Sequence, residues 1–436
     1  MNIRNLGHDK WELMFFMALS MTTFLLLSSI STAYAGPVER AQAKRIHDRL
    51  TGVPPTDADL AFMEDLIVNN NQAGLYGGVS GPEAVARYAM DPAGSSRSKY
   101  FYNVTLKNWI TPWTNEDQTM FAPLNDYTAT VIGIIRDDDV PFSHVLSRDI
   151  VYVGNVTNIQ NGENKTIAGH ANNSNAHYED LESNDIDLSN DQYLERRTQT
   201  EMNMAGGAGG AAGIMTTRAA GQAFFEAGTN RAMFRFTSMN YLCRDLEDLK
   251  DVARVPDRIR QDVSRSPGGD SSIFLNSCVG CHAGMDPLAQ AYARYEWNEA
   301  SGVVEYTPNS IQPKYHINST NFEHGYRTTS DNWSNYWRVG PNAGLGWAAE
   351  GDVNNILNGA GAGTTITVDP VKNISHGTGA ASMGAELAAT VAFAQCQVEK
   401  VYKQVCLQDP ILDHSGAIES ITLQFQSNYD MKQVFA

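Results

Sequence analysis

The sequence predicts a mainly α-helical protein, built as a multi-helix body with long loops. Three observations support this fold class. Apolar residues recur at helical spacing from Glu39 to Leu50, as they do on the buried face of an amphipathic helix. Prolines divide the aromatic-rich stretch from Ser96 to Val153 into segments suited to short helices that pack through their rings. Near the C-terminus, Ala385 to Val405 is long enough for a further helix.

The first 35 residues have the pattern of a signal peptide. Arg4 and Lys10 precede an uncharged stretch from Leu13 to Ile30, and Ala33-Tyr34-Ala35 forms a small-x-small cleavage site before Gly36. A retained membrane anchor is the alternative, but serine and threonine dilute the apolar stretch. No later segment approaches the roughly 20 apolar residues of a membrane span. We therefore expect cleavage after residue 35, no span in the mature chain, and a periplasmic or extracellular location.

The charge of the mature chain restricts its partners. The whole sequence has 49 acidic and 32 basic residues, a formal net charge of -17. Nucleic acid and anionic lipid are themselves negative, so this balance disfavours both as partners. A basic protein or a cationic surface would bind more easily.

Proline positions and changes of composition divide the mature chain into four regions. Pro54-Pro55-Thr56 should end the first helix and open another near Asp57. The regions are an N-terminal helical region at 36–154, a polar surface excursion at 155–206, a helical linker region at 207–265, and a C-terminal region at 266–436.

The C-terminal region contains the most specific motif, Cys278-Val279-Gly280-Cys281-His282. Covalent attachment of a c-type haem requires two thiols at this spacing, followed directly by a histidine that reaches the iron. A redox dithiol and half of a zinc site share the cysteine spacing. A redox dithiol would be expected between a strand and a helix, which the surrounding sequence does not predict. A zinc site would need a second closely spaced Cys or His pair, which is absent from the sequence. We expect one covalent haem c on Cys278 and Cys281, with His282 as axial iron ligand, in a cytochrome c-like region.

The flanks of the motif suggest how a haem would be enclosed. Ser271 and Ser272 can cap a short helix before the motif, and Asp286-Pro287 can open a helix from Leu288 to Trp297. That helix would place aromatic side chains beside the haem, namely Tyr292, Tyr295 and Trp297. Upstream arginines are candidates for pairing with haem propionates. They are Arg254, Arg258, Arg260 and Arg265.

Two runs around the motif carry a resemblance to a known family. The segment from Arg258 to Asp270, followed by the haem motif and Gly284-Met285-Asp286-Pro287-Leu288, resembles the planctomycete-type single-haem cytochrome c family built from domains of unknown function. Looser matches lie at residues 212–217 and at Ala394-Gln395-Cys396. The resemblance implies an exported, mostly helical protein with one haem, and it leaves the physiological reaction open.

The sixth iron ligand is less clearly marked. Met383 follows a glycine-rich loop from Gly359 to Gly379 and would suit an electron carrier, because a methionine ligand raises the reduction potential. His376, beside a glycine that lets the backbone approach a flat cofactor, is the runner-up. His316, His324 and His414 are further candidates. Each of these side chains could instead be an ordinary core or surface residue.

The remaining cysteines are Cys243, Cys396 and Cys406. In an oxidising compartment one pair can form a disulfide, and we expect the third to remain a buried thiol. A single helix through Cys396 and Cys406 would hold them about 15 Å apart and exclude that pair. That pair would need the chain to turn back between them, and the sequence does not choose among the three pairings.

These features favour one-electron transfer in the periplasm or cell envelope, since no catalytic triad or carboxylate pair is apparent. A haem enzyme of the peroxidase or oxygenase type, with an open sixth site, is one alternative. A haem-bearing subunit of an envelope complex is another, with residues 155–206 as a docking surface. The redox partner, any substrate and the oligomeric state are left open.

Overall fold

The protein is mainly helical, as the sequence predicts. The computed structural model describes residues 36–69, 76, 78–205, 209–226, 228–259, 271–315, 326–361 and 364–436. The expected signal peptide at 1–35 lies outside these residues, as do Arg260, Arg265, His316 and His324. Among the described helices, none is both long and apolar enough to cross a membrane.

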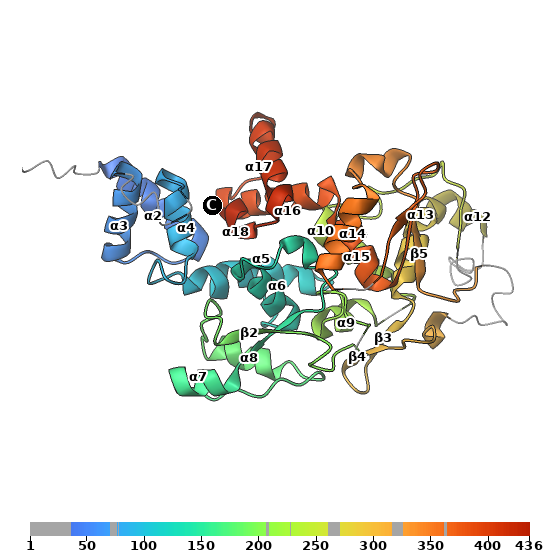
Figure 1. The fold of residues 1–436 in the computed structure, drawn as a ribbon, viewed down its shortest axis with the longest axis horizontal. Helices are drawn as coiled ribbons and strands as arrows, with labels where there is room; N and C mark the ends of the chain where they lie inside the picture. The colour runs from blue at the N-terminus through green and yellow to red at the C-terminus, as the bar shows by residue number, and fades with distance from the viewer. Residues whose placement is uncertain are drawn as a thin grey trace, which may run out of the picture.

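Three helices at the N-terminal end form a small unit at one end of the molecule (Figure 1). They are α2 (Pro37–Thr51), α3 (Asp57–Asn69) and α4 (Gly81–Met90). The first ends at Gly52 in the left-handed conformation, and the second begins at Asp57 after the two prolines. Both boundaries confirm the sequence prediction. These helices enclose their own apolar cluster around Met63, Leu66 and Val85.

The central part of the body is built on a buried helix, α6 (Asp126–Arg136). Asn125 caps it by accepting a hydrogen bond from the Thr128 amide, and every one of its residues is buried. Gly133 lets it pack directly on Tyr152, because a Cβ at that position would lie 2.2 Å from the Tyr152 ring. The other elements of this part of the body are η1 (Phe101–Leu106), α5 (Lys107–Ile110), η2 (Thr111–Thr114), η3 (Phe142–His144), β1 (Val151–Gly154), α7 (Val156–Glu163), α8 (Ala176–Ser183) and β2 (Leu194–Arg197).

Residues 155–206 are part of this body and not a surface excursion. Strand β2 pairs antiparallel with β1, and the Gly154 amide donates to His177 Nε2 of α8 at 2.8 Å. Ile159, Leu181 and Leu194 are fully buried in the principal core. The apolar residues of this segment are too widely spaced along the sequence to give a periodic signal. In the folded chain they nevertheless meet in the principal core.

The C-terminal half contains two further small sheets. One is the hairpin of β3 (Tyr295–Asn298) and β4 (Val303–Tyr306), and the other has the antiparallel order β5-β7-β6. The other elements of this half are α9 (Arg218–Phe224), α10 (Arg231–Leu242), α12 (Ser271–Ile273), η4 (Phe274–Cys278), α13 (Val279–Ala289), η5 (Gln290–Tyr292), η6 (Pro313–Tyr315), β5 (Asn332–Asn335), η7 (Pro341–Leu345), α14 (Glu350–Gly359), β6 (Thr367–Val368), β7 (Ser375–Thr378), α15 (Gly379–Ala388), α16 (Val391–Cys406), η8 (Leu412–His414), α17 (Ser415–Asn428) and α18 (Met431–Phe435).

Two helix predictions in this half are wrong. The expected helix from Leu288 to Trp297 ends early: α13 runs through Pro287 to Ala289, and Tyr295 and Trp297 lie on β3. Pairing of β3 with β4 overrides the helical pattern there. The expected helix from Ala385 to Val405 is two helices, because Thr390 caps a new helix at Val391.

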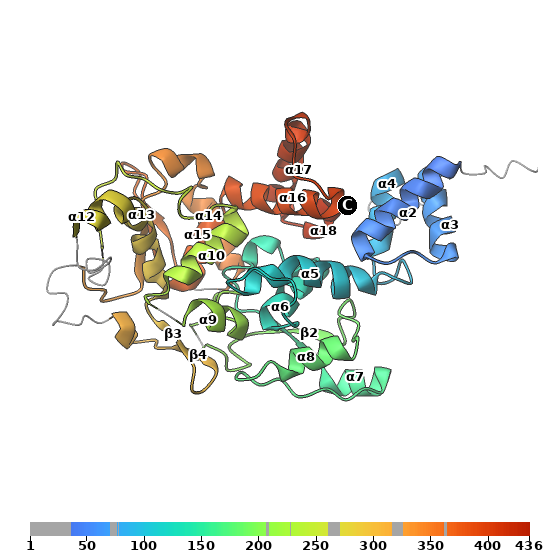
Figure 2. The same cartoon turned by 180° about the vertical axis from the view of Figure 1, so that it is seen from behind.

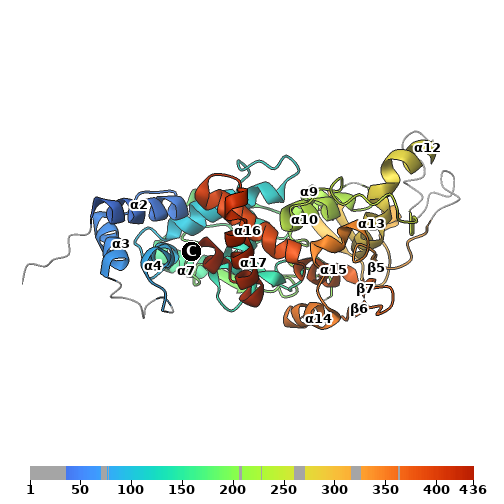
Figure 3. The ribbon, with the colours of Figure 1, turned by 90° about the horizontal axis from the view of Figure 1, so that it is seen from above.

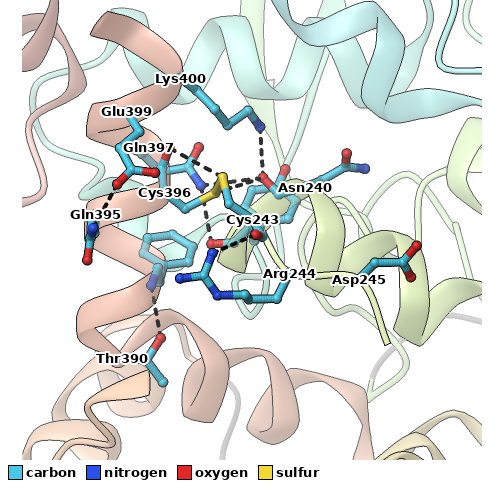
Figure 4. Close-up of a disulfide and its surroundings, with 12 residues drawn as sticks. Asn240, Cys243, Arg244, Asp245, Thr390, Gln395, Cys396, Gln397, Glu399 and Lys400 are labelled. Atoms are coloured by element: carbon cyan, nitrogen blue, oxygen red, sulfur yellow. Dashed lines mark hydrogen bonds between the residues drawn. A yellow bond between two sulfur atoms is a disulfide. The ribbon is translucent and has the colours of Figure 1, made fainter. Parts of the chain in front are cut away.

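A disulfide joins the two sides of the C-terminal half (Figure 4). Cys243, at the end of α10, bonds to Cys396 of α16, and their Cα atoms are 5.3 Å apart. Helix α16 contains both Cys396 and Cys406, which is the condition under which these two cannot pair, and this leaves Cys243 as the partner of Cys396. Cys406 is a free thiol and is exposed, so the expectation of a buried third thiol is wrong. Its position in the last turn of α16 leaves it on the surface.

Candidate haem attachment site

The two motif cysteines and the histidine lie together at the start of α13. Cys278 is the last residue of η4, and Cys281 and His282 stand in the first turn of α13. Both cysteines are free thiols and are partly exposed. In all three overall views α12 and α13 lie at the end of the molecule opposite the N-terminal unit (Figures 1, 2 and 3). The motif is therefore accessible from outside the body.

His282 is held in one orientation by a buried carboxylate. Its Nδ1 is 3.1 Å from Asp286 Oδ1, one helical turn further along α13. The Asp286 side chain has no exposed surface, whereas that of His282 is 20 % exposed. A neutral histidine that donates Nδ1–H to a carboxylate keeps Nε2 as a free acceptor. This is the arrangement that an axial iron ligand requires.

Asp286 in turn forms an ion pair with Arg231 of α10 through two contacts. Arg231 Nε lies 2.9 Å from Oδ1, and its Nη2 lies 3.3 Å from Oδ2 of the same carboxylate. Asn230, which precedes α10, donates from its side-chain amide to the carbonyls of Tyr292 at the end of η5 and Tyr295 at the start of β3, so the start of α10 is fixed to the segment that follows α13. The planar guanidinium therefore holds the Asp286 carboxylate in the position where it meets His282.

The helix that carries the motif packs closely on both sides. A Cβ at Gly284 would lie 1.8 Å from Trp337 Nε1, and one at Gly280 would lie 2.7 Å from Lys250 Cγ. The Gly280 carbonyl also accepts a hydrogen bond from the Asp251 amide. These contacts fix α13 between the segment after α10 and the segment after β5, so the position of the motif is set by the body.

Exposed apolar side chains surround the motif. Val252, which lies against Gly280, is 72 % exposed, and Ile273 and Leu275, in the turns before Cys278, are 42 % and 59 % exposed. Phe274 packs on the His282 ring with 5.7 Å between centroids. Apolar surface beside two thiols and an oriented imidazole fits a flat apolar macrocycle with a central metal. The residues present therefore fit a covalent haem.

The environment of Cys281 differs from that of a redox-active thiol. Burial, followed by the charge of Glu247, raises the pKa of the Cys281 thiol. Redox-active dithiols depend on the opposite shift, since the thiolate is the reactive form. Within the described parts of the chain, no group of three or more His, Cys, Asp or Glu side chains is arranged to hold a metal ion.

The two candidates for the sixth iron ligand occupy different environments. Met383 stands inside α15 and is fully buried in the principal core. His376 is exposed on β7, where Ser334 Oγ lies 2.8 Å from its Nδ1, and burial together with the charge of Arg258 lowers its pKa. Among the described contacts, His282 touches Phe274 and Asp286 and neither candidate. His414 is bonded to Tyr402 on another part of the molecule.

The other residues expected around the haem have internal partners. Tyr292 donates to Met215 Sδ, Tyr295 to the Gly210 carbonyl, and Trp297 to Glu299. Arg254 binds the carbonyls of Tyr336 and Val339, and Arg258 binds that of Asn332. These side chains serve the packing of the C-terminal half.

Sequence reasoning missed the pair that orients His282. Asp286 was expected to cap a helix, although its spacing of four residues from His282 is the signal that places both on one helical face. Arg231 is 55 residues before Asp286, so no local pattern in the sequence indicates that the two side chains meet.

Comparisons with protein-family models, with curated proteins and with solved structures find no match to this chain.

Proposed function

We propose that this protein is an exported mono-haem c-type cytochrome that transfers single electrons in the periplasm or cell envelope. The observation that carries the proposal is the chain of contacts Arg231–Asp286–His282, which orients the histidine of a Cys-x-x-Cys-His motif and leaves its Nε2 free. Asp286 belongs to the run after the motif that resembles the planctomycete-type family, and its contact with His282 gives that run a physical role.

In this proposal each group near the motif has a defined task. Cys278 and Cys281 hold the haem through thioether bonds, and His282 binds its iron. Bound haem supplies a metal that accepts and releases one electron. Asp286 holds the imidazole in one tautomer and orientation, and Arg231 holds the Asp286 carboxylate in place. Of the two expected sixth ligands, the exposed His376 is the more accessible.

Two further features support export. The pair Cys243–Cys396 forms a disulfide, and disulfides persist in oxidising compartments such as the periplasm. The signal pattern in residues 1–35 provides a route to that compartment.

The test is the visible spectrum of the mature protein, exported from a host with the c-type maturation machinery, oxidised and reduced, with and without carbon monoxide. We expect a covalent, low-spin haem that carbon monoxide leaves unchanged, as a six-coordinate electron carrier would show. Rapid carbon monoxide binding would instead favour a haem enzyme with an open sixth site. Absence of covalent haem would refute the proposal.

Replacing Asp286 by asparagine should raise the reduction potential while the haem stays attached. The carboxylate makes His282 a stronger donor and stabilises the oxidised iron, so its loss should raise the potential by about 60 mV, a tenfold change in a one-electron equilibrium. A spectroscopic redox titration measures this shift. Asp245→Asn is the control, because Asp245 forms a comparable two-contact pair with Arg235 on the surface. An equal shift in both variants would exclude a specific effect through His282.

A further inference from the structure

The surface between α16 and α17 contains an apolar groove apart from the haem motif. Its volume is about 580 Å³. One wall is the face of α16 with Val391, Gln395 and Glu399, and the other is a face of α17. Figures 1 and 2 show α17 projecting from the body, at a distance from α12 and α13. The groove residues from the connection and from α17 are Pro410, Ile411, Leu412, Ser415, Ile418, Glu419, Thr422, Leu423 and Gln426.

Large apolar side chains at this groove are exposed to an unusual degree. Leu412 is 92 % exposed, Leu423 62 % and Ile411 50 %, whereas Ile418 on the floor is 5 % exposed. Single exposed leucines are ordinary on a protein surface, but several that converge on one groove mark an interaction site. Burial of apolar surface away from water is favourable, so a partner that covers these side chains would be stabilised by them.

The charge of the groove selects among possible occupants. Glu399 and Glu419 line it, no basic residue does, and neither carboxylate has an ion-pair partner among the described residues. The two lysines nearby are engaged: Lys403 pairs with Asp409 at 2.8 Å, and Lys400 points to the other side of α16, toward the Asn240 carbonyl (Figure 4). The groove is therefore apolar along its length and negative at its walls.

We infer that this groove is a docking site for a basic amphipathic helix of a partner protein. An acidic rim attracts lysine and arginine, and the apolar floor accepts the leucine-type face of such a helix. A second copy of this chain would bring like charges together, and an anionic lipid surface would be repelled. The 14 residues of α17 extend about 21 Å, so a helix of four turns can lie along it. The site is independent of the haem and would hold a partner while leaving the motif accessible.

The test measures binding of a fluorescently labelled helical peptide with one leucine face and one lysine face to the mature protein, by fluorescence polarisation. A matched peptide with glutamate in place of lysine is the first control. We expect the lysine peptide to bind at least about tenfold more tightly than the glutamate peptide, and salt to weaken that binding.

Variants of the protein locate the site. Leu412→Asn with Leu423→Asn should weaken binding of the lysine peptide about tenfold or more, since two leucines lose their burial. Val371→Asn is the matched control, because Val371 is 90 % exposed on another part of the chain. Glu399→Gln with Glu419→Gln should reduce the dependence on salt, and the exposed Glu116→Gln should not.

Three results would overturn the inference. One is equal binding of the lysine and glutamate peptides. Another is unchanged binding by the double leucine variant while its circular dichroism matches that of the parent. The third is a dimer, seen by light scattering, that the leucine substitutions dissociate, because it would assign the groove to a second copy.

Discussion

Replacing Cys278 and Cys281 together by alanine should abolish covalent haem attachment. In the proposed cytochrome each thiol would provide one thioether bond, and His282 alone would leave the haem bound only through its iron and therefore extractable. The exported variant should show no haem stain on a denaturing gel, and its mass should equal that of the bare mature chain. The parent protein should exceed that mass by one haem.

Cys406→Ala is the control for this experiment. Cys406 is a free thiol like the two motif residues, but it is exposed at the end of α16 and lies far along the chain from the motif. This variant should keep the parent's haem content. A Cys278→Ala, Cys281→Ala protein that still carries covalent haem would refute the assignment of the motif.

Replacing Glu386 alone by leucine should destabilise the protein strongly. Glu386 and Arg338 form a buried pair, with Nε–Oε1 and Nη2–Oε2 distances of 2.7 and 3.0 Å and side chains 0 % and 3 % exposed. Loss of the carboxylate leaves a buried guanidinium uncompensated, which costs about 3–5 kcal/mol. The midpoint of urea unfolding, followed by circular dichroism, measures the loss.

The double variant Arg338→Met with Glu386→Leu tests whether the uncompensated charge of Arg338 causes the destabilisation. Removing both charges leaves no unpaired ion, so the double variant should be clearly more stable than Glu386→Leu alone. If the two variants unfold at the same urea concentration, the unpaired charge does not explain the loss, and the hydrogen bonds that Asn335 and Ser375 donate to Glu386, or its packing, do. The pair links the end of β5 to α15, so it also supports the sheet behind α13.

The sequence predicted those features whose signals are local. Two prolines indicated the boundary between α2 and α3, and five consecutive residues define the Cys-x-x-Cys-His motif. The contacts that complete the site are not local. Arg231 reaches Asp286 across 55 residues, so no pattern in either segment reveals the pair.

The prediction of a helix from Leu288 to Trp297 was wrong for the same reason, because contacts with residues distant in the sequence decide the structure of this segment. Its composition suits a helix, but tertiary partners decide its structure: Asn230 binds the carbonyls of Tyr292 and Tyr295, and β4 pairs with residues 295–298. Likewise, nothing near Cys243 indicates Cys396 as its partner, because the two are 153 residues apart. Long-range pairing of this kind depends on the completed fold.

The position of the disulfide has a consequence for how the chain matures. The haem motif lies inside the covalent ring that Cys243 and Cys396 close. In a chain that crosses a membrane from its N-terminal end, Cys243 meets Cys278 and Cys281 before Cys396 emerges. Closing the short 35-residue ring to Cys278 also costs about 1 kcal/mol less chain entropy than closing the native one. In the proposed cytochrome, haem attachment would therefore compete with a non-native disulfide between Cys243 and a motif cysteine, and the order of these two events should determine the yield of native protein.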